Sequence, residues 1–253
     1  MGIETLQDDL EGEIRDAVQA HVKTAQPKSL LPENVTRDAI AKTIDHTQLA
    51  PSATPEDIAK VCEEARVNNF KTVCVNPSRI PMVTTLLKGS SVMPGSAVGF
   101  PSGNSPTPVK AHEARWSVEN GAGEVDFVIA IGHLKAKEYA YVYNDIKAVV
   151  DACPPGFPVK VILETGALER DEIIAGCVIA KRAGASFVKT STGFGPGQAT
   201  IENISLMRAV VGEDIGVKAS GGIRGWEAAR AMLTAGASRI GAKAGVTILD
   251  EME

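Results

Sequence analysis

The chain has 253 residues and a formal net charge of -5 at pH 7. Because it has no surplus of basic residues to neutralise phosphate backbones, the charge argues against a nucleic-acid-binding protein. Hydrophobic residues make up 44% of the sequence and aromatic residues only 4%. We therefore expect a core of Val, Ile, Leu and Ala, as in a parallel sheet covered by helices. Barrels of the α/β class with about 250 residues are commonly a single domain.

The cysteines and the N-terminus bear on where the protein works. The four cysteines are widely spaced and form no CxxC pair, so we expect free thiols in a reducing compartment. The first residues are acidic and lack a long apolar run, which predicts neither a signal peptide nor a transmembrane segment. These features predict a cytosolic protein that does not bind membranes.

Residues 1–40 are predicted to form a helical extension that carries no chemistry. Apolar residues recur every four positions with charges between them, which predicts an amphipathic helix over residues 6–22. Two prolines indicate a linker over residues 24–32, and Thr36 is a candidate N-cap for a short helix that ends at Lys42. We expect the catalytic domain to occupy residues 41–253.

From residue 43 onward, short apolar runs alternate with helical patterns at intervals of roughly 23 to 35 residues, the size of a βαβ unit. We predict strands over residues 43–45, 72–75, 97–100, 124–129, 159–164, 186–189, 215–219 and 239–241. We predict helices between them over residues 55–68, 108–120, 138–153, 170–183, 201–211 and 225–235. Strands and helices in this alternation predict an α/β fold, a closed (β/α)8 TIM barrel.

The stretch over residues 187–195 is a short apolar run that ends in Lys189 and continues into hydroxyls and glycines. This pattern predicts a buried strand that leads into a ligand-binding loop. A lysine at the inner end of a strand is partly removed from water, which lowers its pKa and frees an amine that can form a Schiff base. The alternative is a lysine that caps the strand and reaches solvent.

Charged residues on three predicted strands suggest a catalytic cluster. In a TIM barrel the catalytic groups lie at the C-terminal ends of the strands. Asp126 inside a buried strand is costly unless it is paired, whereas Lys189 and Lys218 on neighbouring strands would repel each other. We predict one cluster in which Lys218 lowers the pKa of Lys189, and Asp126 offsets charge and relays protons. The alternative is a buried ion pair with one lysine reaching solvent.

Glycine-rich turns follow the seventh and eighth predicted strands, over residues 220–222 and 241–245. Barrels often bind phosphate at this place through backbone N–H groups, and Arg224 and Lys243 could add positive charge. The alternative is that these glycines only form tight turns.

The other residues with chemical potential are interpreted as structural. The histidines show neither HxH nor HExxH spacing, so we predict no catalytic metal. His46 is interpreted as a structural histidine at a strand end. Cys74 is interpreted as a buried thiol.

Seven motifs together resemble the deoxyribose-phosphate aldolase family, whose members are class I aldolases. The resemblance covers about residues 43–224 and continues weakly to about residue 249, and its most specific motifs surround Lys189 and Lys218. The motifs lie at residues 43–47, 73–77, 98–101, 124–126, 159–166, 187–195 and 217–224.

The resemblance implies that 2-deoxy-D-ribose 5-phosphate is cleaved reversibly to acetaldehyde and D-glyceraldehyde 3-phosphate. It implies that Lys189 forms the Schiff base, that Lys218 lowers the pKa of Lys189, and that Asp126 relays protons through water. It also implies no metal, no organic cofactor, and a dimer or tetramer of identical chains. The positions that match substrate or phosphate contacts are Asp45, Thr47, Cys74, Thr192, Gly221, Gly222 and Gly241.

Three departures from the family pattern concern substrate preference rather than chemistry. Lys243 and Ala244 stand where serines are usual, so a hydroxyl donor is lost and a cation is gained. We predict that phosphate binding persists with a different geometry and a stronger salt dependence. Ala130 stands where an asparagine is common, and residues 102–106 differ from the usual loop.

Two other functions stay open from the sequence. One is a lysine-dependent barrel aldolase that acts on a different sugar phosphate. The other is a non-catalytic protein that binds a phosphorylated metabolite and has kept the fold. Trapping a covalent adduct at Lys189 separates the enzymes from the binding protein, and the carbonyl donor that traps best separates the two enzymes.

Overall fold

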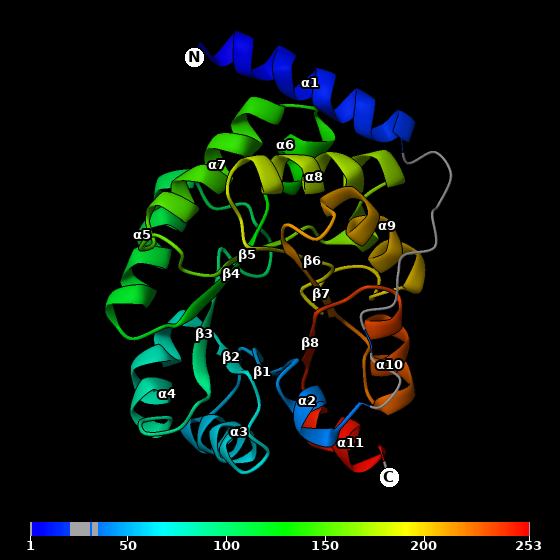
Figure 1. Cartoon of the computed structure of the whole chain (residues 1–253). Coiled ribbons are helices and arrows are strands. Elements are labelled where there is room, and N and C mark those ends of the chain that lie inside the picture. The colour runs from blue at the N-terminus through cyan, green and yellow to red at the C-terminus, as the bar shows by residue number, and fades with distance from the viewer. Residues whose placement is uncertain (1, 21–30, 32–34, 253) are drawn as a thin grey trace.

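The computed structural model describes residues 2–20, 31 and 35–252. Within these residues, parallel strands pair in the order of the chain, and β1 pairs with β8 to close a barrel. Helices surround the barrel on the outside (Figure 1). The predicted (β/α)8 barrel, with a helix before the first strand, is confirmed. The strands are β1 Ile44–Gln48, β2 Thr72–Val75, β3 Met93–Val98, β4 Glu124–Val128, β5 Val159–Ile162, β6 Phe187–Lys189, β7 Gly216–Ser220 and β8 Arg239–Ala242.

An α-helix follows each strand, with two of them after β4, and α1 and α2 precede β1. None of the described helices is long and apolar enough to cross a membrane. The α-helices are α1 Ile3–Ala20, α2 Arg37–Ala41, α3 Pro55–Val67, α4 Ile80–Leu86, α5 Thr107–Glu119, α6 Ile131–Lys135, α7 Tyr139–Asp151, α8 Arg170–Arg182, α9 Ile201–Val211, α10 Trp226–Thr234 and α11 Gly245–Asp250. Two short 3-10 helices are η1 Pro77–Arg79 and η2 Thr165–Ala167.

Several predicted boundaries need correction. Strand β3 begins at Met93 rather than at residue 97, because Pro94 and Gly95 pair with β2 although they look like a turn in the sequence. Strand β5 ends at Ile162, because Glu164 adopts a left-handed backbone with φ of 58°. Helix α4 was not predicted, since its β-branched residues obscure a helical pattern.

The N-terminal region agrees with the prediction where it is described. Thr36 caps helix α2, and its hydroxyl accepts a hydrogen bond from the backbone N–H of Ala39. Helix α1 lies across α7 and α8 outside the barrel (Figure 1), and it buries Leu10 and Ile14 there. Most of the linker predicted over residues 24–32 lies outside the described residues, as does the end of the helix predicted over 6–22.

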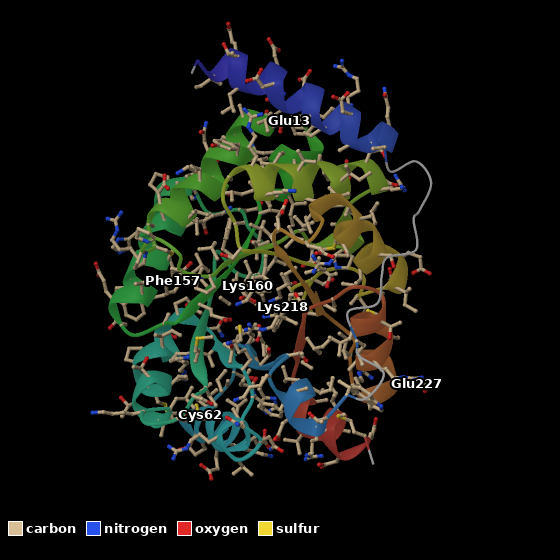
Figure 2. All side chains as sticks on the ribbon, viewed as in Figure 1. Glu13, Cys62, Phe157, Lys160, Lys218 and Glu227 are labelled. Atoms are coloured by element: carbon tan, nitrogen blue, oxygen red, sulfur yellow. The ribbon has the colours of Figure 1, made fainter. Side chains whose placement is uncertain are left out.

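Buried side chains lie on both faces of the barrel strands, and the expected aliphatic core is found on only one of these faces. One set of strand side chains belongs to the main apolar core that includes the surrounding helices, for example Val73, Phe127 and Val188. The alternate positions of the same strands carry buried charged and polar side chains, such as Asp126 and Lys160 on β4 and β5. Figure 2 shows Lys160 and Lys218 near the middle of the barrel. The charged set forms the candidate active site.

Candidate active site

A network of charged side chains fills the inside of the barrel. Because strand side chains alternate between two faces, residues two apart share a face. Glu124 and Asp126 on β4 follow this rule, and both are buried. The charged side chains of this network are Asp45, Glu124, Asp126, Lys160, Lys189, Lys218 and Arg239.

The three residues predicted as a cluster lie in contact. The Nζ atom of Lys189 donates a hydrogen bond to Asp126 Oδ2 at 2.8 Å, and that of Lys218 donates to the same oxygen at 2.7 Å. The other oxygen, Asp126 Oδ1, accepts from Lys160 Nζ at 2.8 Å. A single carboxylate therefore faces three lysine Nζ atoms from three neighbouring strands.

This arrangement shifts the protonation of Lys189. Burial lowers its pKa, because the charged form loses its hydration, and the nearby Lys218 lowers it further against the opposing effect of Asp126. Lys218 shows the opposite result: burial disfavours its charge, but Asp126 and Asp45 raise its pKa. Burial also opposes ionisation of Asp126, but three lysines hold its pKa well below the usual range. Lys189 is therefore the lysine of this pair that is prepared to act as a free amine.

A second group of charges lies toward the N-terminal ends of the strands. Arg239 Nη2 contacts Asp45 Oδ1 at 2.5 Å and Glu124 Oε2 at 2.7 Å. Glu124 also pairs with Lys160, and Asp45 pairs with Lys218 at 2.5 Å. Burial alone would raise the pKa of Asp45, but Lys218, Lys160 and Arg239 lower it to about 2. Asp45, predicted to contact substrate, thus serves here as a counter-ion of Lys218.

The sequence interpretation assigned no role to Lys160, Glu124 or Arg239. The rule that catalytic groups lie at C-terminal strand ends directs attention away from Glu124 and Arg239, which begin their strands. The alternation of side chains along a strand is the signal that could have found them. Glu124 lies two residues before Asp126, and Arg239 lies two residues before Gly241, so each shares a face with a predicted site residue. Charged residues at inward positions of a buried strand need partners inside the barrel.

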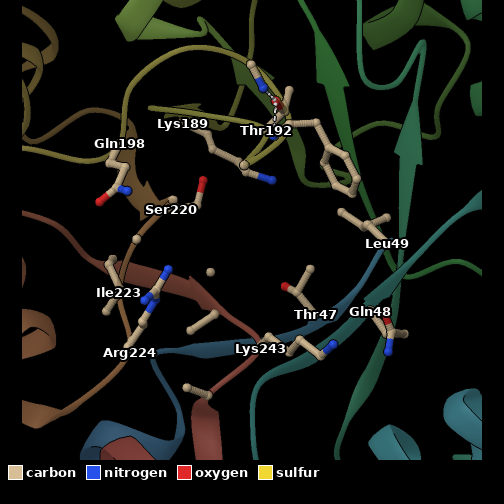
Figure 3. A pocket seen from close by; sticks show the side chains of 18 of the residues that line it. Thr47, Gln48, Leu49, Lys189, Thr192, Gln198, Ser220, Ile223, Arg224 and Lys243 are labelled. Atoms are coloured by element: carbon tan, nitrogen blue, oxygen red, sulfur yellow. Dashed lines mark hydrogen bonds between the residues drawn. The ribbon is translucent and has the colours of Figure 1, made fainter. Parts of the chain in front are cut away.

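A pocket of about 640 Å³ opens at the C-terminal ends of the strands, and Lys189 is part of its lining. In Figure 3 the Lys189 amine points into this pocket, and Arg224 and Lys243 lie on the opposite side. Gly221 and Gly222 also line the pocket. Gly222 has φ of 78°, and a Cβ there would come within 2.0 Å of Gln198 Oε1. This turn therefore requires glycine.

The other predicted contact residues occupy different places. Thr47 and Gly241 line the pocket, whereas Cys74 is buried beside Leu49 and Ala97 in a small apolar cluster. Burial raises the pKa of the Cys74 thiol. His46 points away from this site and contacts Glu64 at 2.7 Å through Nε2, which fits the structural role given to it.

Thr192 is engaged within its own loop. Its hydroxyl donates to the buried carboxylate of Glu164 and accepts from the backbone N–H groups of Phe194 and Gly195 at 3.0 and 3.2 Å. Thr192 lines the pocket, but these bonds make it a brace for the loop. The role of Glu164 was not predicted, because its partner lies 28 residues further along the chain.

Within the part of the chain that the structure describes, no group of three or more His, Cys, Asp or Glu side chains could hold a metal ion. The carboxylates inside the barrel are instead saturated by lysine and arginine. What the arrangement can do chemically is to present an amine of lowered pKa, next to a carboxylate, at the base of an open pocket.

Comparisons with known proteins identify the family of this chain. The model of the DeoC/LacD family of aldolases matches residues 39–251. A deoxyribose-phosphate aldolase of Thermotoga maritima is 53% identical over 210 residues, which cover 83% of this chain and 84% of that protein. One from Caldanaerobacter subterraneus is 54% identical over 214 residues, covering 84% of this chain and 93% of that protein.

Solved structures give the same result. A crystal structure from Coccidioides immitis superposes with a TM-score of 0.91 at 42% identity, covering 97% of both chains. The tetrameric deoxyribose phosphate aldolase of Aeropyrum pernix superposes with a TM-score of 0.80 at 30% identity, covering 94% of this chain and 97% of that one. The family model and these matches show that the chain belongs to the DeoC/LacD family of aldolases.

Proposed function

We propose that this aldolase reversibly cleaves 2-deoxy-D-ribose 5-phosphate to acetaldehyde and D-glyceraldehyde 3-phosphate, with Lys189 as the Schiff-base residue. The observation that carries the proposal is the Lys189 amine, which opens into the pocket while its other neighbours are the buried charges of Asp126 and Lys218. The names of the curated relatives support the choice of substrate.

The proposed reaction begins when the Lys189 amine attacks C1 of the open-chain sugar. Loss of water forms the iminium ion, which can accept an electron pair from the adjacent carbon. Removal of the proton from the C3 hydroxyl then breaks the C2–C3 bond and releases glyceraldehyde 3-phosphate. The electron pair of that bond remains as an enamine, which is protonated at C2, and water releases acetaldehyde from Lys189.

Asp126 and Lys218 would handle the protons of these steps. Asp126 Oδ2 touches both lysine amines, so it can take up and return a proton through a water molecule in the pocket. Lys218 keeps its own proton, since Asp126 and Asp45 raise its pKa against the effect of burial. Its fixed positive charge disfavours protonation of Lys189 throughout the cycle.

The phosphate would bind on the opposite side of the pocket, beside Gly221, Gly222, Arg224 and Lys243. Both cationic side chains are exposed. Backbone N–H groups at glycine-rich turns and nearby cations are the usual ligands of phosphate. Thr47 and Gly241 also line this pocket, where they would contact the sugar chain.

Reductive trapping tests the proposed function. Incubation with deoxyribose 5-phosphate and borohydride should add covalent mass at Lys189, located by peptide mass spectrometry, and Lys189→Met should abolish the adduct. Absence of any adduct in the wild-type protein would instead favour a protein that only binds phosphorylated metabolites. Faster trapping with a different carbonyl donor would indicate an aldolase for another sugar phosphate.

We also propose that the enzyme is a homo-oligomer that works in the cytosol. The tetrameric relative from Aeropyrum pernix supports the first point, and the free, buried state of all four cysteines Cys62, Cys74, Cys153 and Cys177 supports the second. Light scattering after size-exclusion chromatography tests the assembly, with a monomer mass as the opposing result. Fractionation of the source cells tests the location.

A further inference from the structure

The charges inside the barrel do not match in number. Among residues 2–20, 31 and 35–252, the ion pairs of this interior join four cations to three carboxylates. All seven residues are buried, with at most 6% of the surface of any one of them exposed. If every group is ionised, one positive charge is in excess, and an uncompensated buried charge is costly. The network therefore favours the loss of one proton from one cation.

The contacts identify which cation loses it. Arg239 is paired with both Asp45 and Glu124, and a guanidinium group stays charged in proteins. Lys218 contacts Asp45 as well as Asp126. The other two cations, Lys160 and Lys189, differ in how many carboxylates they contact.

Lys160 contacts Glu124 and Asp126 closely, with Asp45 at 3.9 Å. Lys189 has one carboxylate partner among the described residues, Asp126, and shares its Oδ2 with another lysine. It is thus the least compensated of the four cations.

Lys160 restricts what Asp126 can offer to Lys189. It occupies Asp126 Oδ1 at 2.8 Å, so the two lysines nearer the pocket compete for Oδ2. Without Lys160, the carboxylate could give each of those lysines its own oxygen, which would favour the protonated form of Lys189. Glu124 acts in the opposite sense, because it pairs with Lys160 and Arg239 and its negative charge offsets part of the excess positive charge.

The ring of Phe187, the first residue of β6, packs against two cations of this network. The ring centroid lies 5.8 Å from Lys160 Nζ and 5.7 Å from the guanidinium carbon of Arg239. The neighbouring residue on β7 is Gly216, where a Cβ would come within 2.0 Å of the ring. An apolar ring at this place lowers the local dielectric constant, which strengthens the interactions between the neighbouring charges.

We propose that Lys160 and Glu124 are positioning residues whose charges set the balance inside the barrel, and that a single excess cation keeps the Lys189 amine unprotonated. Neither residue lines the pocket, so both act through Asp126 and not on the substrate. The inference rests on the proposed Schiff-base role of Lys189. It extends that role from the contacting residues to the whole charge balance of the interior.

The charged and titratable neighbours of Lys189 come from nearly every strand, and β3 contributes none, since Met93–Val98 contains no titratable side chain. Burial lowers the pKa of Lys189, Asp126 and Cys74 oppose this, and Lys218 reinforces it. Among the described residues, the groups that face this site are Asp45 on β1, Cys74 on β2, Glu124 and Asp126 on β4, Lys160 on β5, Lys218 on β7 and Arg239 on β8, with Arg224 and Lys243 across the pocket. The buried carboxylate of Glu164, directly after β5, accepts hydrogen bonds from Thr192 and forms no ion pair with these cations.

Three variants test the charge balance directly. Lys160→Met removes one cation, so Lys189 can stay protonated without an excess charge, and Glu124→Gln removes one carboxylate, so the excess grows. The double variant restores the original difference of one. The rate of adduct formation at Lys189 with acetaldehyde and cyanoborohydride, followed against pH, reports the free amine. We expect the midpoint to rise by about one pH unit in Lys160→Met, to fall by about one unit in Glu124→Gln, and to return in the double variant.

The direction of these shifts separates charge balance from a structural role. Loss of structure would slow trapping in both single variants without moving their midpoints in opposite directions. Midpoints that stay at the wild-type value, or that move the same way, would overturn the inference. If one single variant does not fold, as judged by circular dichroism, the other single variant and the double variant decide by the same criterion. Absence of trapping at Lys189 in the wild type would instead contradict the proposed function.

Discussion

Lys110 and Lys189 are both buried lysines hydrogen-bonded to an aspartate, but their surroundings differ in charge. Lys110 lies on α5, and its Nζ donates to Asp145 Oδ2 on α7 at 2.7 Å and to the backbone carbonyl of Val128 on β4 at 3.1 Å. Thr107 donates to the other oxygen of Asp145 at 2.8 Å. This pair has one charge of each sign, whereas Lys189 shares Asp126 with two other lysines.

From this difference we expect that burial alone does not make a lysine reactive. Lys110 is fully buried, but its carboxylate is matched to it and no part of it lines the pocket. Lys189 is buried among an excess of cations, and its amine opens into the pocket. We expect the charge-matched pair to stabilise the packing of two helices, and the unmatched one to make an amine available for chemistry.

The sharpest test of this contrast is to remove each lysine in turn. Lys189→Met should lower kcat/KM for deoxyribose 5-phosphate by roughly 10⁴-fold or more, because the nucleophile is lost. Its free energy of unfolding should not fall, since the substitution removes the excess charge and leaves Asp126 paired with Lys160 and Lys218. Steady-state kinetics and urea unfolding measure the two effects. Activity within tenfold of wild type would contradict the role of Lys189.

The matched pair should respond in the opposite way. Lys110→Met leaves Asp145 buried without a counter-ion, which should cost about 3–5 kcal/mol of unfolding free energy. Because Lys110 does not touch the pocket, kcat/KM per folded molecule and the pH midpoint of Lys189 trapping should stay unchanged. Urea unfolding and active-site titration check both. A shifted midpoint would show that the two groups are coupled.

The sequence allows prediction of the barrel and of the three central charges for a clear physical reason. Asp126, Lys189 and Lys218 interrupt apolar runs, and charged residues inside buried strands must find each other. The alternation of strands and helices was also visible, and the predicted bounds of β2 agree with the structure. Apolar runs and the charges that interrupt them can be read from residues that are close together in the sequence.

The features that could not be predicted from the sequence depend on contacts between distant segments. Glu124 and Arg239 form one group only because the barrel closes and brings β4 and β8 to the same interior. Thr192 had a hydroxyl in the right loop, but its partner Glu164 comes from the end of another strand. Helix α4 was overlooked because its sequence favours strands, and packing against β3 overrides that preference.

Removal of Lys218 should make Lys189 more like the matched Lys110, because Asp126 Oδ2 would then pair with Lys189 alone. The pKa of Lys189, lowered in the wild type by burial and by Lys218, should rise in Lys218→Leu. At a fixed neutral pH the fraction of free amine then falls, and kcat/KM should drop by about tenfold for each unit of the rise. The loss should shrink as the pH increases. A loss that is constant with pH would show that Lys218 acts on another step.

Lys243 offers the third setting, an exposed lysine that has no buried partner among the described residues. In Lys243→Ala we expect KM for deoxyribose 5-phosphate to rise by roughly fivefold at low salt, about 1 kcal/mol, as for an exposed ion pair. The effect should fade as salt is added, because solvent-exposed charges are screened. The pH midpoint of Lys189 trapping should not move, since the buried network is shielded from those ions. Unphosphorylated 2-deoxyribose is the matched control, and an equal change in its KM would show that Lys243 does not act on the phosphate.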